Sequence, residues 1–209
     1  MSGDIATILS RVPVIPVLTI ARVEDSVALA RALVDGGLSV LEITLRTDAA
    51  LDAIAAIARD VPDAVTGAGT VLNRADLRCA REAGAQFAVS PGLTENLATE
   101  GLPLLPGVAT ASEIMRGMEY GLRHFKFFPA ESSGGVAALK SFAGPFPDIR
   151  FCPTGGITAK SAPDYLAVKN VMCVGGSWMV PHAMITAQDW RGIAKLAAEA
   201  ASLRKGKRP

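Results

Sequence analysis

The sequence alternates strand-like runs with helix-like segments at a spacing of about twenty residues, and this alternation restricts the possible folds more than any other feature. Eight runs are rich in branched aliphatic and aromatic residues, at 12–18, 40–46, 64–67, 86–90, 103–106, 123–128, 149–153 and 171–174. A helical pattern follows nearly all of them, which is typical of a parallel sheet with crossover helices. Eight such units close into a (β/α)8, or TIM, barrel. We therefore expect a small α/β barrel.

The segments between the runs predict the helices of that barrel. A short N-terminal helix is expected within residues 1–11, and further helices at 24–35, 49–59, 74–83, near 101, 112–120, up to 143, at 161–168 and at 189–203. We expect one domain over residues 1–209, with a frayed basic tail from about residue 204. An open doubly wound sheet is the alternative. It usually carries a Gly-x-Gly-x-x-Gly turn after the first strand, and the sequence has none there.

Composition argues against several classes of function. The formal net charge of the 209 residues is +1, which gives no electrostatic reason to expect nucleic acid or a membrane surface as a partner. No apolar run is long enough to span a bilayer, and no signal-peptide pattern is visible. The three cysteines lack metal-type spacing and are expected to be reduced core residues of a cytoplasmic protein. With only two histidines, a metal centre is not expected.

One charged residue interrupts the sixth strand-like run. Lys126 stands between Phe125 and Phe127 in a segment that ends at Pro129. Burying an ammonium group costs several kcal/mol, and a buried lysine that loses its proton becomes a nucleophile toward carbonyl groups. A lysine whose head group reaches solvent or pairs with a carboxylate is the structural alternative. This segment alone does not decide between the two.

The second strand-like run also carries charge on one face. Side chains alternate along a strand, so Glu42, Thr44 and Arg46 share a face, and Leu41 and its apolar partners share the other. If the apolar face meets the helices, a carboxylate and a guanidinium enter the barrel beside Lys126. A purely structural Glu–Arg pair is the alternative, although three converging charges favour an active site.

Glycine-rich segments follow the seventh and eighth runs. They read Thr154-Gly155-Gly156 and Gly175-Gly176-Ser177. Barrels often bind phosphate at these two positions, through backbone amides and the start of a short helix. Either segment alone is a weak signal. Together, after the expected strands, they predict a phosphate site.

With these residues placed, nearly the whole chain resembles the 2-dehydro-3-deoxy-phosphogluconate (KDPG) aldolases of the Entner–Doudoroff pathway, in the KDPG/KHG aldolase family. The motifs that carry the resemblance are Pro-Val-Leu-Thr at 16–19, Leu-Glu-Ile-Thr-Leu-Arg-Thr at 41–47, Gly-Ala-Gly-Thr-Val-Leu at 67–72, Ser-Pro-Gly at 90–92, Phe-Lys-Phe-Phe-Pro-Ala-Glu at 125–131, Pro-Thr-Gly-Gly-Ile at 153–157 and Gly-Gly-Ser-Trp at 175–178. They are specific in combination and in order.

The resemblance implies a metal-independent class I aldolase without a cofactor, assembled as a homotrimer. It places the Schiff-base lysine on Lys126 and the proton-transferring glutamate on Glu42. Contacts to the pyruvate carboxylate fall on Arg46, Thr70, Thr154 and Pro91, and contacts to phosphate fall on Gly155, Gly156, Gly175, Gly176 and Ser177. The implied substrate is a phosphorylated keto-deoxy sugar acid, with 4-hydroxy-2-oxoglutarate as a second substrate.

Three alternatives stay open at this point. The nearest is the same chemistry on the C4 epimer, by a 2-dehydro-3-deoxy-6-phosphogalactonate aldolase. The others are a barrel isomerase or synthase that uses Lys126 as an acid or counter-ion, and a non-catalytic barrel that binds phosphorylated metabolites. Departures from the family pattern, among them His124 and Ser132-Ser133, lie outside the proposed catalytic positions.

Overall fold

The structure of this protein is a computed structural model that describes residues 4–98 and 101–205. Within these residues the strands are β1 Val14–Leu18, β2 Val40–Thr44, β3 Val65–Gly69, β4 Phe87–Val89, β5 Leu104–Leu105, β6 Gly107–Val108, β7 His124–Phe127, β8 Arg150–Pro153 and β9 Val174–Gly176. The helices are α1 Ile5–Ser10, α2 Val23–Asp35, α3 Ala50–Asp60, α4 Arg74–Glu82, α5 Glu95–Ala98, α6 Ala111–Glu119, α7 Gly135–Phe142, α8 Ala162–Leu166, α9 His182–Thr186 and α10 Trp190–Ala201, followed by the 3-10 helix η1 Ser202–Lys205.

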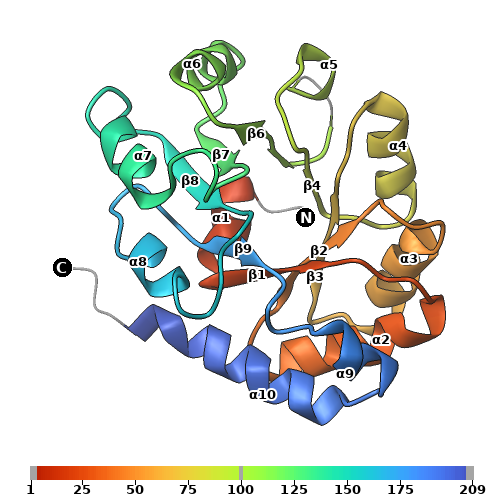
Figure 1. Ribbon diagram of the computed structural model, residues 1–209. Coiled ribbons are helices and arrows are strands. Elements are labelled where there is room, and N and C mark those ends of the chain that lie inside the picture. The colour runs from red at the N-terminus through yellow and green to blue at the C-terminus, as the bar shows by residue number, and fades with distance from the viewer. Residues whose placement is uncertain (1–3, 99–100, 206–209) are drawn as a thin grey trace.

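The strands form a curled parallel sheet with the longer helices outside it (Figure 1). One sheet has the order β5-β4-β3-β2-β1-β9 and a second has the order β6-β7-β8. Every strand pair is parallel. The α/β class and the parallel pairing predicted from the sequence are therefore confirmed. Because parallel strands place their carboxyl ends at one edge, the predicted polar groups gather at the same end of the fold.

The fifth predicted strand differs from the expectation, because it is divided in two. Pro106 separates β5, which pairs with β4, from β6, which pairs with β7. Proline has no N–H to donate to a sheet ladder, which explains the interruption. Its carbonyl still accepts a hydrogen bond of 2.9 Å from the backbone N–H of Lys126. The Pro106 carbonyl thus helps to hold β7, the strand of Lys126, in register.

The two sheets approach each other again on the side of β8 and β9. Isolated parallel bridges join Phe151 to Val171 and Thr154 to Gly175. The eighth strand was predicted at 171–174, whereas β9 begins at Val174 and contains Gly175 and Gly176. These two glycines therefore belong to a strand and not to the turn that the sequence suggested.

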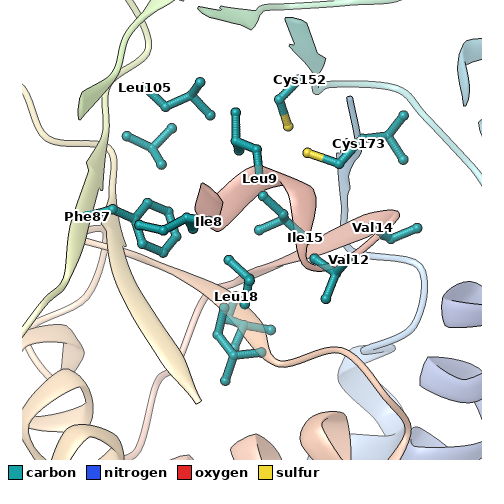
Figure 2. Packing of buried hydrophobic residues seen from close by; sticks show 14 of the residues in the cluster. Ile8, Leu9, Val12, Val14, Ile15, Leu18, Phe87, Leu105, Cys152 and Cys173 are labelled. Atoms are coloured by element: carbon teal, nitrogen blue, oxygen red, sulfur yellow. The ribbon is translucent and has the colours of Figure 1, made fainter. Parts of the chain in front are cut away.

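Helix α1 lies across the interior of the curled sheet, at the amino ends of the strands. Figure 2 shows Ile8 and Leu9 pointing among Phe87, Leu105 and Ile15, all of them buried. Burying apolar surface is the main favourable contribution to folding, at about 25 cal/mol for each Å² removed from water. The N-terminal helix thus closes the end of the core opposite to the polar residues.

Local signals explain several helix starts. Thr110 and Glu113 form a reciprocal capping box at the start of α6, and Asn73 and Asp189 accept backbone hydrogen bonds at the starts of α4 and α10.

Near residue 101 only the short α5 is described, and 99–100 lie outside the described residues. Of the predicted basic tail, 204–205 end η1 and 206–209 lie outside the described residues. No helix in the described part of the chain is long and apolar enough to cross a membrane.

Candidate active site

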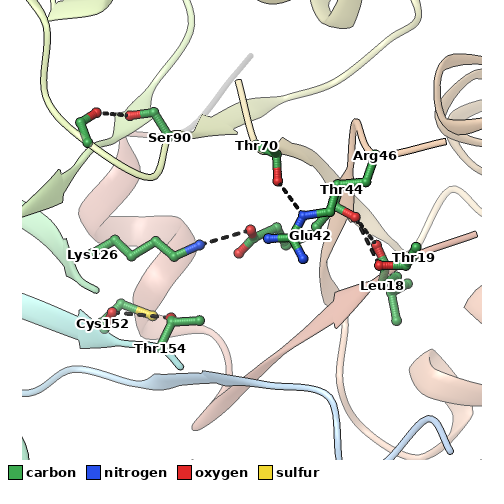
Figure 3. A network of polar contacts seen from close by, with 11 residues as sticks. Leu18, Thr19, Glu42, Thr44, Arg46, Thr70, Ser90, Lys126, Cys152 and Thr154 are labelled. Atoms are coloured by element: carbon green, nitrogen blue, oxygen red, sulfur yellow. Dashed lines mark hydrogen bonds and ion pairs between the residues drawn. The ribbon is translucent and has the colours of Figure 1, made fainter. Parts of the chain in front are cut away.

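Lys126 and Glu42 form a buried ion pair inside the curled sheet. The Nζ atom of Lys126 lies 3.2 Å from Oε1 of Glu42, and the two side chains are 5% and 4% exposed (Figure 3). Lys126 comes from β7 and Glu42 from β2, on opposite sides of the interior. The two-residue alternation of each strand turns both side chains inward. The arrangement places an amine beside a carboxylate, as nucleophilic and acid–base chemistry requires.

The surroundings of Glu42 leave little free space. A side chain at Gly69, on the neighbouring strand β3, would place its Cβ 2.7 Å from Cγ of Glu42. Glycine is therefore required at the end of β3 if the carboxylate is to keep its position. On the other side of the pair, Nζ of Lys126 lies 5.0 Å from the ring centroid of Phe128, within the range of a cation–π contact.

Arg46 lies at the mouth of the interior rather than within it, which corrects the sequence-based expectation. Strand β2 ends at Thr44, and Arg46 follows a tight turn and is exposed. Its Nε donates a hydrogen bond of 3.0 Å to Oγ1 of Thr70, directly after β3. Thr70 has a φ of 59°, a left-handed conformation that is rare for a β-branched residue. Such outliers gather at functional sites, where the surrounding contacts hold them.

Threonines support the same end of β2. The hydroxyl of Thr44 donates 2.9 Å to the carbonyl of Leu18 and lies 3.2 Å from the hydroxyl of Thr19 (Figure 3). Thr47 also donates a hydrogen bond across to the backbone of Ile20. These contacts fasten the end of β2 to the end of β1. The backbone that leads to Arg46 is therefore held from one side by threonines.

The segment after β8 forms a true glycine turn. Gly155 and Gly156 have φ values of 105° and 79°, which side chains rarely tolerate. Thr154 stands before them, with its hydroxyl 3.4 Å from the carbonyl of Cys152. Lys126 and Cys152 are register partners on β7 and β8, so this turn begins close to the lysine.

The segment after β9 uses its glycines differently. A Cβ at Gly175 would overlap the hydroxyl of Thr154, and a Cβ at Gly176 would overlap the ring of Trp178. These positions therefore require glycine because neighbouring groups are close, and not because of a left-handed backbone. Ser177 follows them and is exposed.

These elements enclose a cavity of about 160 Å³ that contains most of the predicted site. The residues of the predicted site that line this cavity are Arg46, Lys126, Thr154, Gly155, Gly156, Gly175, Gly176 and Ser177. Glu42 and Thr70 join this set through their contacts with Lys126 and Arg46. The charge of Lys126 is balanced by Glu42, and the Arg46 guanidinium at the cavity favours an anionic ligand.

Three apolar lining residues were not predicted. Val17, Phe128 and Ile157 complete the cavity wall. Val17 is the register partner of Glu42, and Phe128 lies two residues beyond Lys126, so face alternation applied to these strands would have found both. Pro91, which was predicted, is not among the lining residues. Its carbonyl instead occupies the space that a side chain at Gly107 would need.

A second cavity of about 140 Å³ lies between the end of β1, the start of α2 and α9. It contains no residue of the predicted site. The carboxylate of Asp25 there accepts 3.3 Å from Gln188 and lies 3.6 Å from Nε of Arg22, so its polar groups already have partners. Among the residues that the structure describes, no cluster of three or more His, Cys, Asp or Glu side chains is arranged to hold a metal ion.

Comparison with known proteins gives a consistent result. The family model for KDPG and KHG aldolase matches residues 5–196. The KHG/KDPG aldolase of Escherichia coli K12 is 58% identical over 93% of each chain, and the 2-dehydro-3-deoxy-phosphogluconate aldolase of Dickeya dadantii is 58% identical over 92% of each. A crystal structure of KDPG aldolase from Legionella pneumophila, with pyruvate captured as a covalent carbinolamine, covers 96% of this chain and 100% of its own at 43% identity and a TM-score of 0.93.

A more distant structure separates two of the sequence-based alternatives. A native KDPGal structure matches with a TM-score of 0.81 but only 26% identity, over 92% of this chain and 94% of its own. The identity of 58% to the aldolases of Escherichia coli and Dickeya dadantii is about twice the identity of 26% to the KDPGal structure. The comparison disfavours the galactonate series.

Proposed function

Because this chain belongs to the KDPG and KHG aldolase family, we propose that it is a class I aldolase that cleaves KDPG into pyruvate and D-glyceraldehyde 3-phosphate. The observation that carries the proposal is the buried contact of 3.2 Å between Lys126 and Glu42 at the cavity. This reaction belongs to the Entner–Doudoroff pathway, and 4-hydroxy-2-oxoglutarate is the expected second substrate.

In the proposed mechanism, the Lys126 ammonium passes a proton to the neighbouring Glu42 carboxylate, and the neutral amine attacks the C2 ketone of the substrate. Glu42 returns this proton to the hydroxyl group that leaves the carbinolamine as water. The carbinolamine loses water and becomes an iminium, which accepts the electron pair of the C3–C4 bond. That bond breaks when a base removes the proton of the C4 hydroxyl, and Glu42, directly or through a water molecule, is that base. Glyceraldehyde 3-phosphate leaves, the enamine takes a proton at C3, and water releases pyruvate from Lys126.

The two ends of the substrate have separate partners in this proposal. Arg46, oriented by its hydrogen bond of 3.0 Å to Thr70, holds the carboxylate, with Thr154 close to it. Backbone amides at Gly155, Gly156, Gly175 and Gly176, together with the hydroxyl of Ser177, hold the phosphate. Pro91 is assigned no direct contact. Binding at both ends orients C2 toward the amine of Lys126.

Trapping with borohydride tests the covalent step. Incubation with pyruvate and borohydride followed by peptide mapping is expected to show one stable adduct, on Lys126. Lys126→Ala is expected to show no adduct and no cleavage activity. Lys140→Ala, which removes an exposed lysine on α7, serves as the matched control and keeps the adduct. An adduct on another lysine, or none in the wild type, contradicts the class I mechanism.

Two assays address the alternatives. Cleavage measured side by side on the gluconate and galactonate epimers is expected to favour the gluconate series. An isomerase or a binding protein that uses Lys126 without covalent chemistry would give no trapped pyruvate. Both measurements use the purified protein and need no partner protein.

We infer a closed (β/α)8 barrel that forms one domain, since only Pro106 separates β5 from β6 and two bridges join the sheets at β8 and β9. A single cooperative unfolding transition is expected of one domain.

A homotrimer is the proposed assembly, and Leu72 and Met115, exposed at 58% and 57%, are the first positions to test at its contacts. Sedimentation velocity measures the assembly, and cell fractionation tests the proposed cytoplasmic location.

A further inference from the structure

The turns after β7 and β8 are joined by their backbones. The N–H of Ala130 donates 2.8 Å to the carbonyl of Thr154, and the N–H of Glu131 donates 3.1 Å to the carbonyl of Gly155. These bonds continue the pairing of the two strands beyond their ends. The position of the turn at Gly155 therefore depends on the segment that follows Lys126.

The aliphatic part of Glu131 lies directly against Gly156. A side chain at Gly156 would place its Cβ 2.6 Å from Cγ of Glu131 and 2.8 Å from its Cβ. The α-carbon of Gly156 thus rests on the side chain of Glu131. Gly156 has a φ of 79°, and glycine can adopt many other backbone conformations, so a neighbour fixed against it helps to hold its amide in one direction.

Tyr165 holds the other end of Glu131. Its hydroxyl donates a hydrogen bond of 2.9 Å to Oε1 of Glu131, and its side chain is almost fully buried on α8. The same hydroxyl lies 3.1 Å from the position that a Cβ at Gly135 would take, at the start of α7. Helices α7 and α8 are neighbours on the outside of the fold (Figure 1). Tyr165 therefore fixes the Glu131 carboxylate relative to both helices.

Burial, together with the hydrogen bond to the Glu131 carboxylate, raises the pKa of Tyr165 well above its ordinary value. The phenol therefore stays protonated across the range in which proteins are normally active. The direction of the bond is fixed as a result, with Tyr165 as donor and Glu131 as acceptor. The Glu131 carboxylate is directed at Tyr165 by this bond. Its negative charge therefore has a hydrogen-bond donor, although it lies beside the site proposed for phosphate.

We propose that Glu131 and Tyr165 are positioning residues that set the Gly155–Gly156 backbone for the phosphate of the substrate. Neither residue lines the cavity, so their effect reaches the ligand through Gly156. This role rests on the proposed aldolase function and extends it. It predicts that the pair influences the phosphorylated end of the substrate and leaves the chemistry at Lys126 unchanged.

Tyr165→Phe is the first test because it removes one oxygen and keeps the ring packing. The KM for KDPG is expected to rise about three- to tenfold. The change removes a hydrogen bond to a charged group, and structural adjustment around Glu131 absorbs part of the loss. The value of kcat and the rate of pyruvate trapping at Lys126 are expected to stay within twofold of the wild type. Tyr120→Phe makes the same chemical change at the C-terminal end of α6 and is the matched control.

Variants of Glu131 provide the second test. Glu131→Ala removes both the support under Gly156 and the acceptor, so its KM for KDPG is expected to rise at least as much as that of Tyr165→Phe. Glu131→Gln keeps an acceptor oxygen for Tyr165 and the same stem, and is expected to restore a KM near that of the wild type. Because the two residues act as a unit, the double variant Glu131→Ala/Tyr165→Phe is expected to behave like Glu131→Ala alone.

The outcomes separate this role from a purely structural one and from the proposed function itself. A wild-type KM in Tyr165→Phe overturns the positioning role. An equal loss of pyruvate trapping and of KDPG binding also overturns it, because the pair would then support the fold generally. If the wild type forms no pyruvate adduct, the aldolase assignment fails and this inference fails with it. Normal trapping with an unchanged KM rejects the positioning role alone.

Discussion

The Nζ atom of Lys126 lies 3.2 Å from the Oε1 atom of Glu42, and both side chains are buried in a fold whose interior is otherwise mainly apolar. The two residues are 84 positions apart in the sequence and come from different sheets. Removing two charges from water is expensive, and their attraction offsets this cost only while both are present. Each residue is therefore expected to depend on the other for stability as well as for catalysis.

Removing only the cation should destabilise the protein more than removing both charges. Lys126→Met leaves the Glu42 carboxylate buried without its partner, and the free energy of unfolding is expected to fall by about 3–5 kcal/mol. Urea-induced unfolding followed by circular dichroism measures this loss. The double variant Lys126→Met/Glu42→Leu replaces the pair with apolar groups and should recover most of it. If the double variant is as unstable as the single one, the two charges are not coupled.

Arg46 should act on the carboxylate end of the substrate. Arg46→Lys keeps the charge but loses the planar fork and the bond from Nε to Thr70. We expect about tenfold weaker pyruvate binding, measured as the pyruvate concentration that gives half-maximal trapping on Lys126. Arg191→Lys, on the exposed surface of α10, is the matched control. Pyruvate binding as tight as in the wild type would remove Arg46 from the carboxylate site.

Ser177 should act on the phosphate end. Ser177→Ala removes a hydroxyl donor and is expected to raise the KM for KDPG about tenfold while pyruvate trapping stays unchanged. It is a cleaner probe than a large residue at Gly176, which would also displace the ring of Trp178. Ser141→Ala, on the exposed face of α7, is the matched control. Equal effects on pyruvate and on KDPG would contradict separate binding of the two ends.

Chelation should leave the reaction unaffected. The iminium on Lys126 accepts electrons in the role that a Lewis-acidic metal plays in other aldolases, so no divalent ion is required in the proposed mechanism. Turnover measured before and after exhaustive dialysis against a chelator is expected to be the same within error. A large loss that one divalent cation restores would require a metal-dependent mechanism.

Periodicity in the sequence was sufficient to predict the parallel sheet and the inward direction of the central charges. Lys126 and Glu42 each stand in a strand with apolar neighbours on the other face, and this local pattern survives in the fold. The place of the glycine segments after the seventh and eighth runs then indicated the phosphate site, and the family motifs located Thr70, which alternation alone could not. Both kinds of signal depend only on residues close together in the chain.

The features that the sequence did not predict depend on contacts between distant segments. The division of the fifth strand follows from which neighbour each half pairs with on either side of Pro106. On α6, Met115 is 57% exposed, whereas Ile114 and Gly117 are the residues that the helix buries. The bond between Tyr165 and Glu131 joins residues 34 positions apart. No local pattern marks such a pair.

His124 should make stability depend on pH. Burial, reinforced by the positive charge of Arg150 and opposed by Asp4, holds the pKa of this imidazole below its ordinary value of 6.5. Between that lowered pKa and 6.5 the unfolded chain binds more protons than the folded one. Stability is therefore fully present above pH 6.5 and falls as the pH drops through this window. His124→Gln is expected to reduce the fall.

Urea unfolding at pH 8 and at pH 5.5, at one fixed protein concentration, measures this effect. The wild type is expected to lose more stability between the two pH values than His124→Gln does, because only the wild type must keep the half-buried imidazole of His124 neutral. The other histidine gives the matched control, since His182→Gln changes an exposed ring on α9 and leaves His124 in place. If His124→Gln loses as much stability on acidification as the wild type, the burial of His124 does not produce the pH dependence.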